Sequence, residues 1–212
     1  MSKIILGDCL EVMRGFKDNQ FDWIITDPPY GKMWTRNNGK TFGFGSSGEL
    51  TEDDKTEWDK FTPSQEYFDE MFRVSKNQII FGGNYFTDKL PISNCWIVWD
   101  KVGNHKFNNP FADCELAWTS SNKVVKKYVV VQQGFVKDTK DKRVHPTQKP
   151  TELMKAVLAD FVKGGETILD PFAGSGSTIK AAKDLGFEAT GIEISPEYVK
   201  IAQDRLKQEV LL

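Results

Sequence analysis

Short apolar runs alternate with segments of helical periodicity along this chain. Runs with the length of buried strands occupy Lys3–Leu6, Phe21–Thr26, Gln78–Phe81, Cys95–Trp99, Cys114–Thr119, Thr167–Leu169 and Ala189–Ile194. Apolar residues recur at helical spacing in Ser64–Val74, Thr151–Val162, Ser177–Leu185 and Pro196–Leu206. Because buried parallel strands are apolar throughout and are joined by helices, this alternation predicts an α/β fold with a mostly parallel sheet.

Residues 31–61 and 120–146 depart from this alternation. The first segment is rich in glycine, asparagine, serine and charged residues, and its length predicts a mobile loop with a functional role. The second includes a short β-like stretch at Lys127–Val131, followed by a basic run. Neither has the pattern of a separate core, so we expect residues 1–212 to form a single domain.

The composition is that of an ordinary soluble globular protein, with 39% hydrophobic and 27% charged residues. No apolar run reaches about 18 residues, and the chain does not begin like a secretion signal, so we expect a cytoplasmic protein with no membrane partner. The three cysteines are scattered and form no CxxC pair, which argues against a disulfide framework and against zinc. With only two histidines as well, we expect no metal site.

The charge is unevenly distributed, although the net charge is only -2. Residues 119–149 hold eight basic residues against two acidic ones, a local charge of +6. A basic stretch on an otherwise acidic protein is expected of a face that contacts phosphates, although a solvated loop would show the same charges. The basic residues are Lys123, Lys126, Lys127, Lys137, Lys140, Lys142, Arg143 and Lys149.

The tetrapeptide Asp27, Pro28, Pro29 and Tyr30 stands directly after the apolar run Phe21–Thr26. Proline lacks an N–H and has a fixed φ, so the backbone must leave the sheet there and present its carbonyls to a ligand. A carboxylate, a free carbonyl and an aromatic ring at one strand end suit the exocyclic amino group of a planar base. The alternative is a turn that only ends the strand.

A second motif, TILDPFAGSGST, covers residues 167–178 and predicts a strand, a Gly/Ser turn and a helix. Glycines allow close approach to a ligand, and a helix N-terminus attracts an anionic group, unless the turn merely closes a tight connection. The motif lacks the GK[ST] of a phosphate-binding loop and the third glycine of a dinucleotide site, whereas Glu193 stands about 20 residues beyond it. A nucleoside with a small carboxylate fits best, and S-adenosylmethionine has that shape, with a sulfonium suited to Asp27, Asp170 and Phe172.

With DPPY early, HPTQKP at residues 145–150 and DPFAGSGST late, at residues 170–178, the chain resembles the amino-group DNA methyltransferases of the β class. The resemblance covers about residues 3–206. It implies a doubly wound, Rossmann-like sheet of seven strands, one of them antiparallel near the edge, with the catalytic half first in the chain. It also implies S-adenosylmethionine as the cofactor and double-stranded DNA as the partner.

The resemblance assigns cofactor contacts to residues on several predicted strand ends. The acid after the first strand would meet the adenine amino group, Glu193 would bind the ribose, and Asp170 with Phe172 would line the methionine side. The segment HPTQKP would hold the methionine carboxylate. The full predicted set is Asp8, Cys9, Thr147, Lys149, Asp170, Phe172, Gly174, Ser175, Gly176 and Glu193.

The resemblance also implies a mechanism. The N6 lone pair of adenine is delocalised into the ring, so the enzyme must localise it. Asp27 would accept one N6–H and the carbonyl of Pro28 the other, while Pro29 completes the motif. Tyr30 would stack on a base flipped out of the duplex. The catalytic residues are thus expected to be Asp27, Pro28, Pro29 and Tyr30.

The sequence argues against one alternative reaction and leaves several others open. Methylation at carbon 5 of cytosine would need a cysteine preceded by proline, and none of the three cysteines has one. Cytosine N4 is the nearest rival, although family members acting on cytosine more often carry serine at the position of Asp27. RNA, or a protein glutamine for which the family usually has asparagine first, is a further alternative, and so is a catalytically idle DNA-binding module.

Residues 101–146 are the only stretch available for a target-recognition region, and they are short for that task. We therefore expect a brief recognition sequence, or weak discrimination, with help from residues 31–61. Members of this family are often homodimers, so the resemblance favours a homodimer. The sequence itself decides neither the oligomeric state nor whether a companion restriction enzyme exists.

Overall fold

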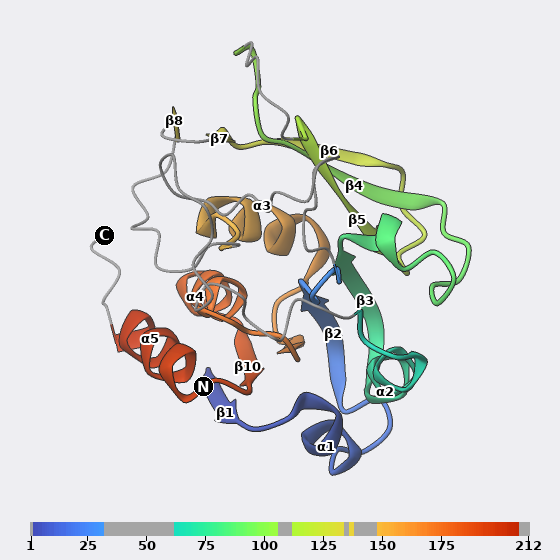
Figure 1. The fold of residues 1–212 in the computed structure, drawn as a ribbon, viewed down its shortest axis with the longest axis vertical. Coiled ribbons are helices and arrows are strands. Elements are labelled where there is room, and N and C mark those ends of the chain that lie inside the picture. The colour runs from blue at the N-terminus through green and yellow to red at the C-terminus, as the bar shows by residue number, and fades with distance from the viewer. Residues whose placement is uncertain (1, 32–61, 106–111, 134–135, 138–147, 208–212) are drawn as a thin grey trace, which may run out of the picture.

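The computed structural model describes residues 2–31, 62–105, 112–133, 136–137 and 148–207, and these build one central sheet with helices on both faces (Figure 1). Its strands are β1 (Lys3–Leu6), β2 (Phe21–Thr26), β3 (Ser75–Phe81), β4 (Cys95–Asp100), β5 (Cys114–Thr119), β6 (Lys126–Val129), β9 (Thr167–Asp170) and β10 (Glu188–Glu193). Their order across the sheet is β1-β10-β9-β2-β3-β5-β4-β6. A separate antiparallel pair is made by β7 (Gln132–Gln133) and β8 (Val136–Lys137).

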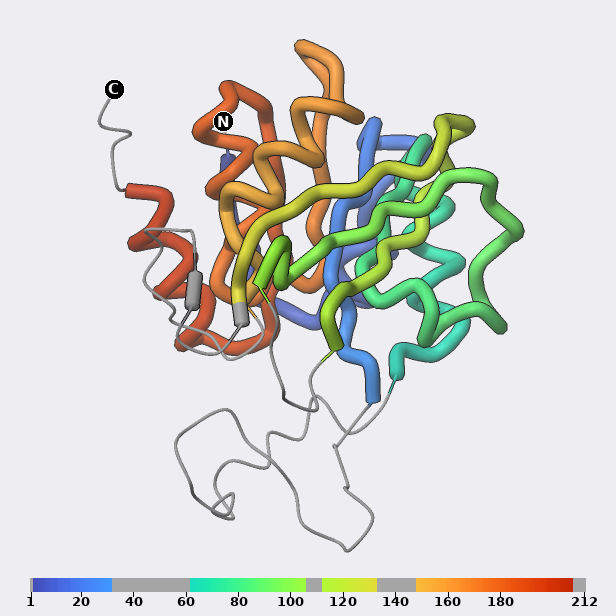
Figure 2. Tube along the Cα trace, turned by 90° about the horizontal axis from the view of Figure 1, so that it is seen from above, coloured from blue at the N-terminus to red at the C-terminus, as the bar shows by residue number. Residues whose placement is uncertain are grey.

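The helices are α1 (Cys9–Arg14), α2 (Gln65–Val74), α3 (Thr151–Phe161), α4 (Ser177–Asp184) and α5 (Pro196–Lys207), with a short 3-10 helix, η3 (Gly83–Tyr85). Seen from above in Figure 2, α3, α4 and α5, in orange and red, lie on the opposite side of the molecule from α2, in teal. None of the helices in the described part of the chain is long and apolar enough to cross a membrane.

Within this sheet β5 runs antiparallel to both of its neighbours, and every other pairing is parallel. The predicted mostly parallel sheet is therefore confirmed. Its predicted size of seven strands is wrong, because β6 adds to the outer edge of β4, with Ile97 opposite Lys126. The sequence showed this stretch only as a short β-like run, since its side chains alternate between half-buried and exposed positions.

The two faces of the sheet carry separate apolar clusters, as a doubly wound fold requires. Trp23 and Ile25 of β2 pack on one face with Leu153 of α3, whereas Ile24 packs on the other face with Phe68 of α2. Successive side chains of a strand point to opposite faces, so the continuous apolar run of β2 serves both clusters. The predicted doubly wound architecture is confirmed by this arrangement.

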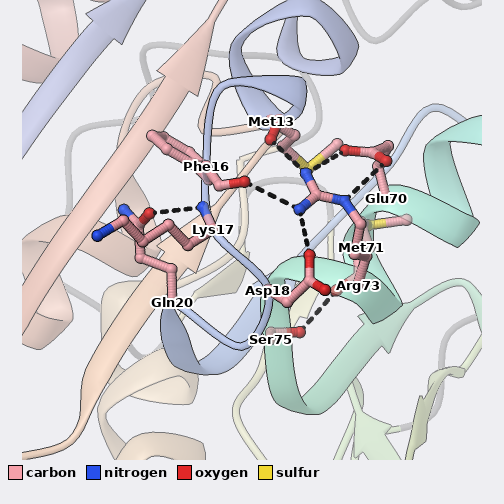
Figure 3. Close-up of polar contacts among 9 residues, drawn as sticks. All are labelled: Met13, Phe16, Lys17, Asp18, Gln20, Glu70, Met71, Arg73 and Ser75. Carbon is pink, nitrogen blue, oxygen red and sulfur yellow. Dashed lines mark hydrogen bonds and ion pairs between the residues drawn. The ribbon is translucent and has the colours of Figure 1, made fainter.

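Arg73 at the end of α2 ties that helix to the turn after α1 (Figure 3). Its guanidinium donates hydrogen bonds to the carbonyls of Met13 and Phe16, both over 2.9 Å, and pairs with Asp18 and Glu70, both over 2.7 Å. Since these partners satisfy the backbone at the end of α1, they hold the helix pair together on the side of the sheet away from α3. This contact is structural and lies beside β2, the strand that carries the candidate site.

Candidate active site

The carboxyl ends of the parallel strands carry the predicted site residues, and the fold brings those ends to one edge of the sheet. Asp27 follows β2, Asp170 is the last residue of β9, and Glu193 is the last residue of β10. Because β5 runs in the opposite direction, its first residues lie at the same edge, which adds Glu115 to this group. In open α/β sheets this edge is where ligands bind.

Asp27 uses both carboxylate oxygens for contacts within the protein. Tyr30 donates its hydroxyl to Oδ1 over 2.5 Å, and Nζ of Lys149 lies 2.5 Å from Oδ2. Burial raises the pKa of Asp27 above its ordinary value, and the nearby Lys149 opposes that rise. The carboxylate is thus only partly exposed to water, and the ammonium of Lys149 favours its charged form.

Lys149 lies between two carboxylates, with only 8% of its side chain exposed. Its Nζ is 2.5 Å from Asp27 and 3.1 Å from Oε2 of Glu115, and it faces the rings of Phe81 and Trp99 at 5.5 and 5.9 Å. Burial alone would lower the pKa of Lys149, but the two carboxylates outweigh it and raise that pKa well above its usual value. Lys149 is therefore a permanent cation at the site.

Glu115 completes this charge cluster, and the sequence analysis missed it. Nζ of Lys101 lies 3.0 Å from its Oε1, and Lys149 lies 3.1 Å from its Oε2. Burial works against the charge of Glu115, yet the two lysines lower its pKa to about 2. Its only signal in the sequence is an acid at the start of a predicted strand, which gains meaning once β5 is known to be antiparallel.

The ring of Tyr30 packs into an aromatic wall. Its centroid lies 4.8 Å from that of Tyr85 and 6.0 Å from that of Phe86. Gly82 stands against the ring with φ of 67°, and a Cβ added there would come within 2.0 Å of a Tyr30 ring carbon. Only glycine accepts both this backbone conformation and this proximity, so the position of Tyr30 depends on Gly82.

Asp170 is a second buried carboxylate at the site, with 3% of its surface exposed. Its Oδ1 accepts hydrogen bonds from the hydroxyl of Thr26 over 2.7 Å and from the N–H of Phe172 over 3.1 Å. Burial raises its pKa to about 6, while hydrogen bonds from Thr178 and Thr26 act in the opposite direction. An acid in this condition is stabilised in its charged form by any cation that binds beside it.

The Gly/Ser turn after β9 adopts a backbone that needs glycine at two positions. Gly174 has φ of 51°, and Gly176, the N-cap of α4, has φ of 79°. A Cβ on Gly176 would also stand 2.9 Å from the Cβ of Ala202, so the turn lies close against α5. Glu193 accepts hydrogen bonds from the N–H groups of Gly174 and Ser195, both over 2.8 Å, and thus joins the turn to the end of β10.

Arg205 of α5 supports the same turn and was not expected from the sequence. Its Nη1 donates to the carbonyl of Ser175 over 2.7 Å, and its Nη2 donates to the hydroxyl of Thr151 over 3.1 Å. These bonds connect the turn with the start of α3, two residues after Lys149. The two predicted cofactor segments are therefore coupled through one guanidinium.

Asp8 and Cys9, which follow the first strand, lie at the start of α1. Oδ1 of Asp8 accepts from two backbone N–H groups at the start of α1, and its Oδ2 accepts from the hydroxyl of Tyr67 over 3.3 Å. Tyr67 also pairs its ring with Phe172, at a centroid distance of 6.1 Å. Cys9 is buried in the core, and burial raises the pKa of its thiol, so this thiol stays protonated.

Only part of the basic stretch lies within the described residues, and its described side chains contact other residues of the protein. Lys123 donates to the backbone carbonyl of Asp160, Lys126 pairs with the carboxylate of that residue at 3.7 Å, and Lys127 pairs with Asp100 at 2.8 Å. Lys149 is buried at the site, as described above. The side chains of Lys137, Lys140, Lys142 and Arg143 lie outside the described residues, as do Thr147 and all but the first residue of 31–61.

Comparisons with known proteins agree with this interpretation of the site. A family model described as DNA methylase (N6_N4_Mtase) matches residues 85–204, more than half of the chain. The type II methyltransferase M.HinfI of Haemophilus influenzae is 30% identical over 262 residues, covering 98% of this chain and 69% of its own. M.HpaI of Haemophilus parainfluenzae is 28% identical, covering 98% of this chain and 74% of its own.

Solved structures support the fold. The M1.HpyAVI–SAM complex has a TM-score of 0.60 and 23% identity, and the match covers 98% of this chain and 100% of that one. The cytosine-N4-specific PvuII DNA methyltransferase has a TM-score of 0.64 with 14% identity, and covers 100% and 88%. The family match spans β4 to α5, which includes Glu115, Lys149 and the Gly/Ser turn. The chain therefore belongs to the DNA methylase family of N6 and N4 amino-methyltransferases.

Proposed function

We propose that this protein transfers a methyl group from S-adenosylmethionine to N6 of an adenine that is flipped out of double-stranded DNA. The observation that carries the proposal is the half-buried carboxylate of Asp27, paired with the buried Lys149 at the strand edge that also carries Asp170 and the glycine turn. Asp27 follows β2 and Asp170 ends the neighbouring strand β9, so both carboxylates stand at the same edge of the sheet. Asp27 suits an amine, and Asp170 suits a cation.

The residues at the ends of β9 and β10 fit the cofactor. Asp170 is buried with a pKa of about 6, and a sulfonium beside it would replace the solvent that burial has removed. The turn at Gly174 and Gly176 brings backbone close to a ligand, and α4 begins at its end. When bound, S-adenosylmethionine supplies an electrophilic methyl group. M1.HpyAVI, whose fold this chain shares, was solved as a complex with SAM.

Asp27 acts on the substrate amine in this proposal. A hydrogen bond from N6 to its carboxylate draws the nitrogen away from planarity, and the carbonyl of Pro28 would receive the second N–H. As the nitrogen gains a methyl group it loses one proton, and the carboxylate of Asp27 is the acceptor beside it. Tyr30 would leave Asp27 to stack on the base, because its hydroxyl occupies Oδ1 before the substrate arrives.

Adenine is preferred over cytosine because the motif begins with Asp27. Cytosine N4 is the second candidate, and the shared fold with the cytosine-N4-specific PvuII enzyme favours keeping it. The exocyclic nitrogen of either base needs the same carboxylate and carbonyl acceptors. We further propose that residues 101–146 and 31–61 read a brief DNA sequence, and that a companion restriction enzyme recognises the same site.

The test is incubation of the purified protein with S-adenosylmethionine and unmethylated duplex DNA, followed by digestion to nucleosides and mass spectrometry. We expect N6-methyldeoxyadenosine. Formation of N4-methyldeoxycytidine alone would replace adenine by cytosine in the proposal. If neither product forms while the folded protein still binds S-adenosylmethionine, methylation of DNA is rejected.

A further inference from the structure

We infer that Glu115 is a positioning residue for the proposed methyl transfer, because it takes over the ammonium group of Lys149 when Asp27 accepts the substrate amine. The inference rests on the proposed function and assigns a role to a residue that the motifs do not include. It starts from a conflict in the resting site. Both oxygens of Asp27 are occupied, by Tyr30 and by Lys149, so the carboxylate has to be released before it can act.

Lys149 cannot release Asp27 by moving into water. Its side chain is 8% exposed, and moving a buried ammonium away from its counter-charges into water is costly. It needs a second anion within reach of a small rotation. Oε2 of Glu115 stands 3.1 Å from the same Nζ, which is close enough to receive the ammonium without any movement of the backbone.

Oε2 of Glu115 is paired with Lys149 at 3.1 Å in the resting site, but the ammonium is not oriented to it. It is shielded from solvent, and it has no hydrogen bond of good geometry among the residues that the structure describes. A buried carboxylate oxygen without a proper hydrogen bond is unfavourable, so a rotation of Lys149 toward it would be rewarded. The resting state therefore places the hydrogen bond of Lys149 on Asp27 and leaves Glu115 with the longer ion pair alone.

The position and charge of Glu115 are both secured from the other side. It lies opposite Trp99 in the β4–β5 ladder, and Lys101, two residues beyond Trp99, holds its Oε1 at 3.0 Å. The pKa of Glu115 is about 2, so the carboxylate remains charged over the range in which the protein is folded. Lys149 can thus alternate between two fixed anions at constant total charge.

The charges near Asp27 make the inferred role of Glu115 measurable through the pKa of Asp27. Lys149 and the hydroxyl of Tyr30 lower the pKa of Asp27, Glu115 raises it, and Asp170 stands at the same edge of the sheet. In Glu115→Gln the raising charge is lost, and among the residues that the structure describes only Asp27 still pairs with Lys149. Both changes lower the pKa of Asp27, and the carboxylate of Asp27 is then bound more tightly by Lys149.

The experiment compares wild type and Glu115→Gln in two assays. The first measures kcat and its pH profile for methyl transfer. We expect kcat on the plateau to fall at least about tenfold, the factor carried by one charge-assisted hydrogen bond, while the acidic limb moves to lower pH. A purely structural role would reduce the rate without moving that limb. Glu115→Asp retains the charge and should bring the limb back toward its wild-type position.

Asp184→Asn is the matched control, since Asp184 is also a carboxylate between two lysines, Lys155 at 2.7 Å and Lys180. It lies at the end of α4 and has 5% of its side chain exposed. We expect it to reduce stability and to leave the pH profile unchanged. If it moves the acidic limb as Glu115→Gln does, the effect is a general one of lost charge and the inference is overturned.

The second assay does not depend on activity. Proteins labelled with carbon-13 in the aspartate and glutamate carboxyls are titrated by NMR, and Asp27 is assigned from Asp27→Asn. We expect the pKa of Asp27 to fall in Glu115→Gln, and an unchanged pKa overturns the inference. If the wild type transfers no methyl group, the proposed function fails while this titration still decides whether Glu115 and Asp27 share Lys149.

Discussion

Strand β2 carries an aspartate at each end, and the two have opposite electrostatics. Asp22 pairs with Lys76 at 2.7 Å and accepts from the backbone and hydroxyl of Thr167, and the hydrogen bond from Lys76 is the main reason that its pKa is lowered. Asp27 also has a lysine partner, at 2.5 Å, yet burial raises its pKa.

The two carboxylates differ in the surroundings of their lysine partners. Asp22 stands at the amino-terminal edge, where its lysine is 56% exposed and every contact favours the charged form. Asp27 stands at the carboxyl edge, where its lysine is buried and is shared with Glu115. The two aspartate side chains are equally exposed, at 23% and 24%, so the difference lies in their lysines. A carboxylate with an exposed lysine of its own stabilises the fold, whereas one that shares a buried lysine is prepared for another ligand.

The largest expected effect separates the two ends by activity. Asp27→Ala should reduce methyl transfer by about 10³-fold or more, because it removes the acceptor for the amine. Asp22→Ala should leave kcat within about twofold and reduce only stability. Steady-state kinetics on one DNA substrate measures both. Equal losses in the two variants would mean that the carboxyl edge has no special role.

The second test compares the two lysines. Lys149→Met leaves Asp27 without its cation and Glu115 with Lys101 alone, so we expect the free energy of unfolding to fall by about 3 to 4 kcal/mol. Lys76→Met removes an exposed partner and should change it little. Urea denaturation followed by circular dichroism measures both changes. Should Lys76→Met be as damaging as Lys149→Met, burial is not what distinguishes the two pairs.

The third test uses pH. The pKa of Asp170 is about 6 in the folded protein and near 4 in the unfolded chain, so its contribution to stability is present below about pH 4 and is lost as the pH rises through about 6. This amounts to about 3 kcal/mol.

We therefore expect Asp170→Asn to gain stability relative to wild type as the pH rises from about 4 to about 7. Asp22→Asn should show the reverse, because a lowered pKa gives stability that is present above the unfolded value and lost on acidification. Denaturant midpoints measured across that range check both. A difference between Asp170→Asn and wild type that is independent of pH would contradict the raised pKa.

The smallest effect concerns Tyr30. Tyr30→Phe keeps the ring and removes only the hydrogen bond to Asp27, so we expect kcat to change by less than about threefold. Tyr30→Ala removes the stacking surface as well and should cost about 10- to 100-fold in kcat/KM. Kinetics of the three proteins on one DNA duplex separates ring from hydroxyl. If the phenylalanine variant loses as much as the alanine variant, the hydroxyl carries the function.

Periodicity predicted the elements well where the pattern was long. The bounds of β1 and β2 agree with the prediction at both ends, and α3 differs by one residue. The six-residue helix α1 was missed, because it is too short to show a helical period and Asp8, which caps it, had been interpreted only as a ligand. The fold and the family are confirmed, whereas the roles of the individual site residues stay predictions.

The site was harder to predict than the fold because its contacts join distant parts of the chain. Asp27 and Lys149 are 122 positions apart, and nothing in either motif indicates that they meet. The sequence interpretation gave Lys149 to the methionine carboxylate, and in the structure its contacts are with the catalytic motif and Glu115. Arg205 and Tyr67 escaped notice for the same reason, since each lies in a helix with no motif of its own.

The sequence by itself determined the alternation of strands and helices, the glycine turn with its acids, and the motif at the end of β2, because these depend on neighbours within a few positions. Tertiary structure decided that β5 runs antiparallel, which places Glu115 at the carboxyl edge of the sheet. It also decided that Lys149 lies between two carboxylates. Strand direction and burial arise from the packing of the whole chain, and they set which charges face one another and how strongly water screens them.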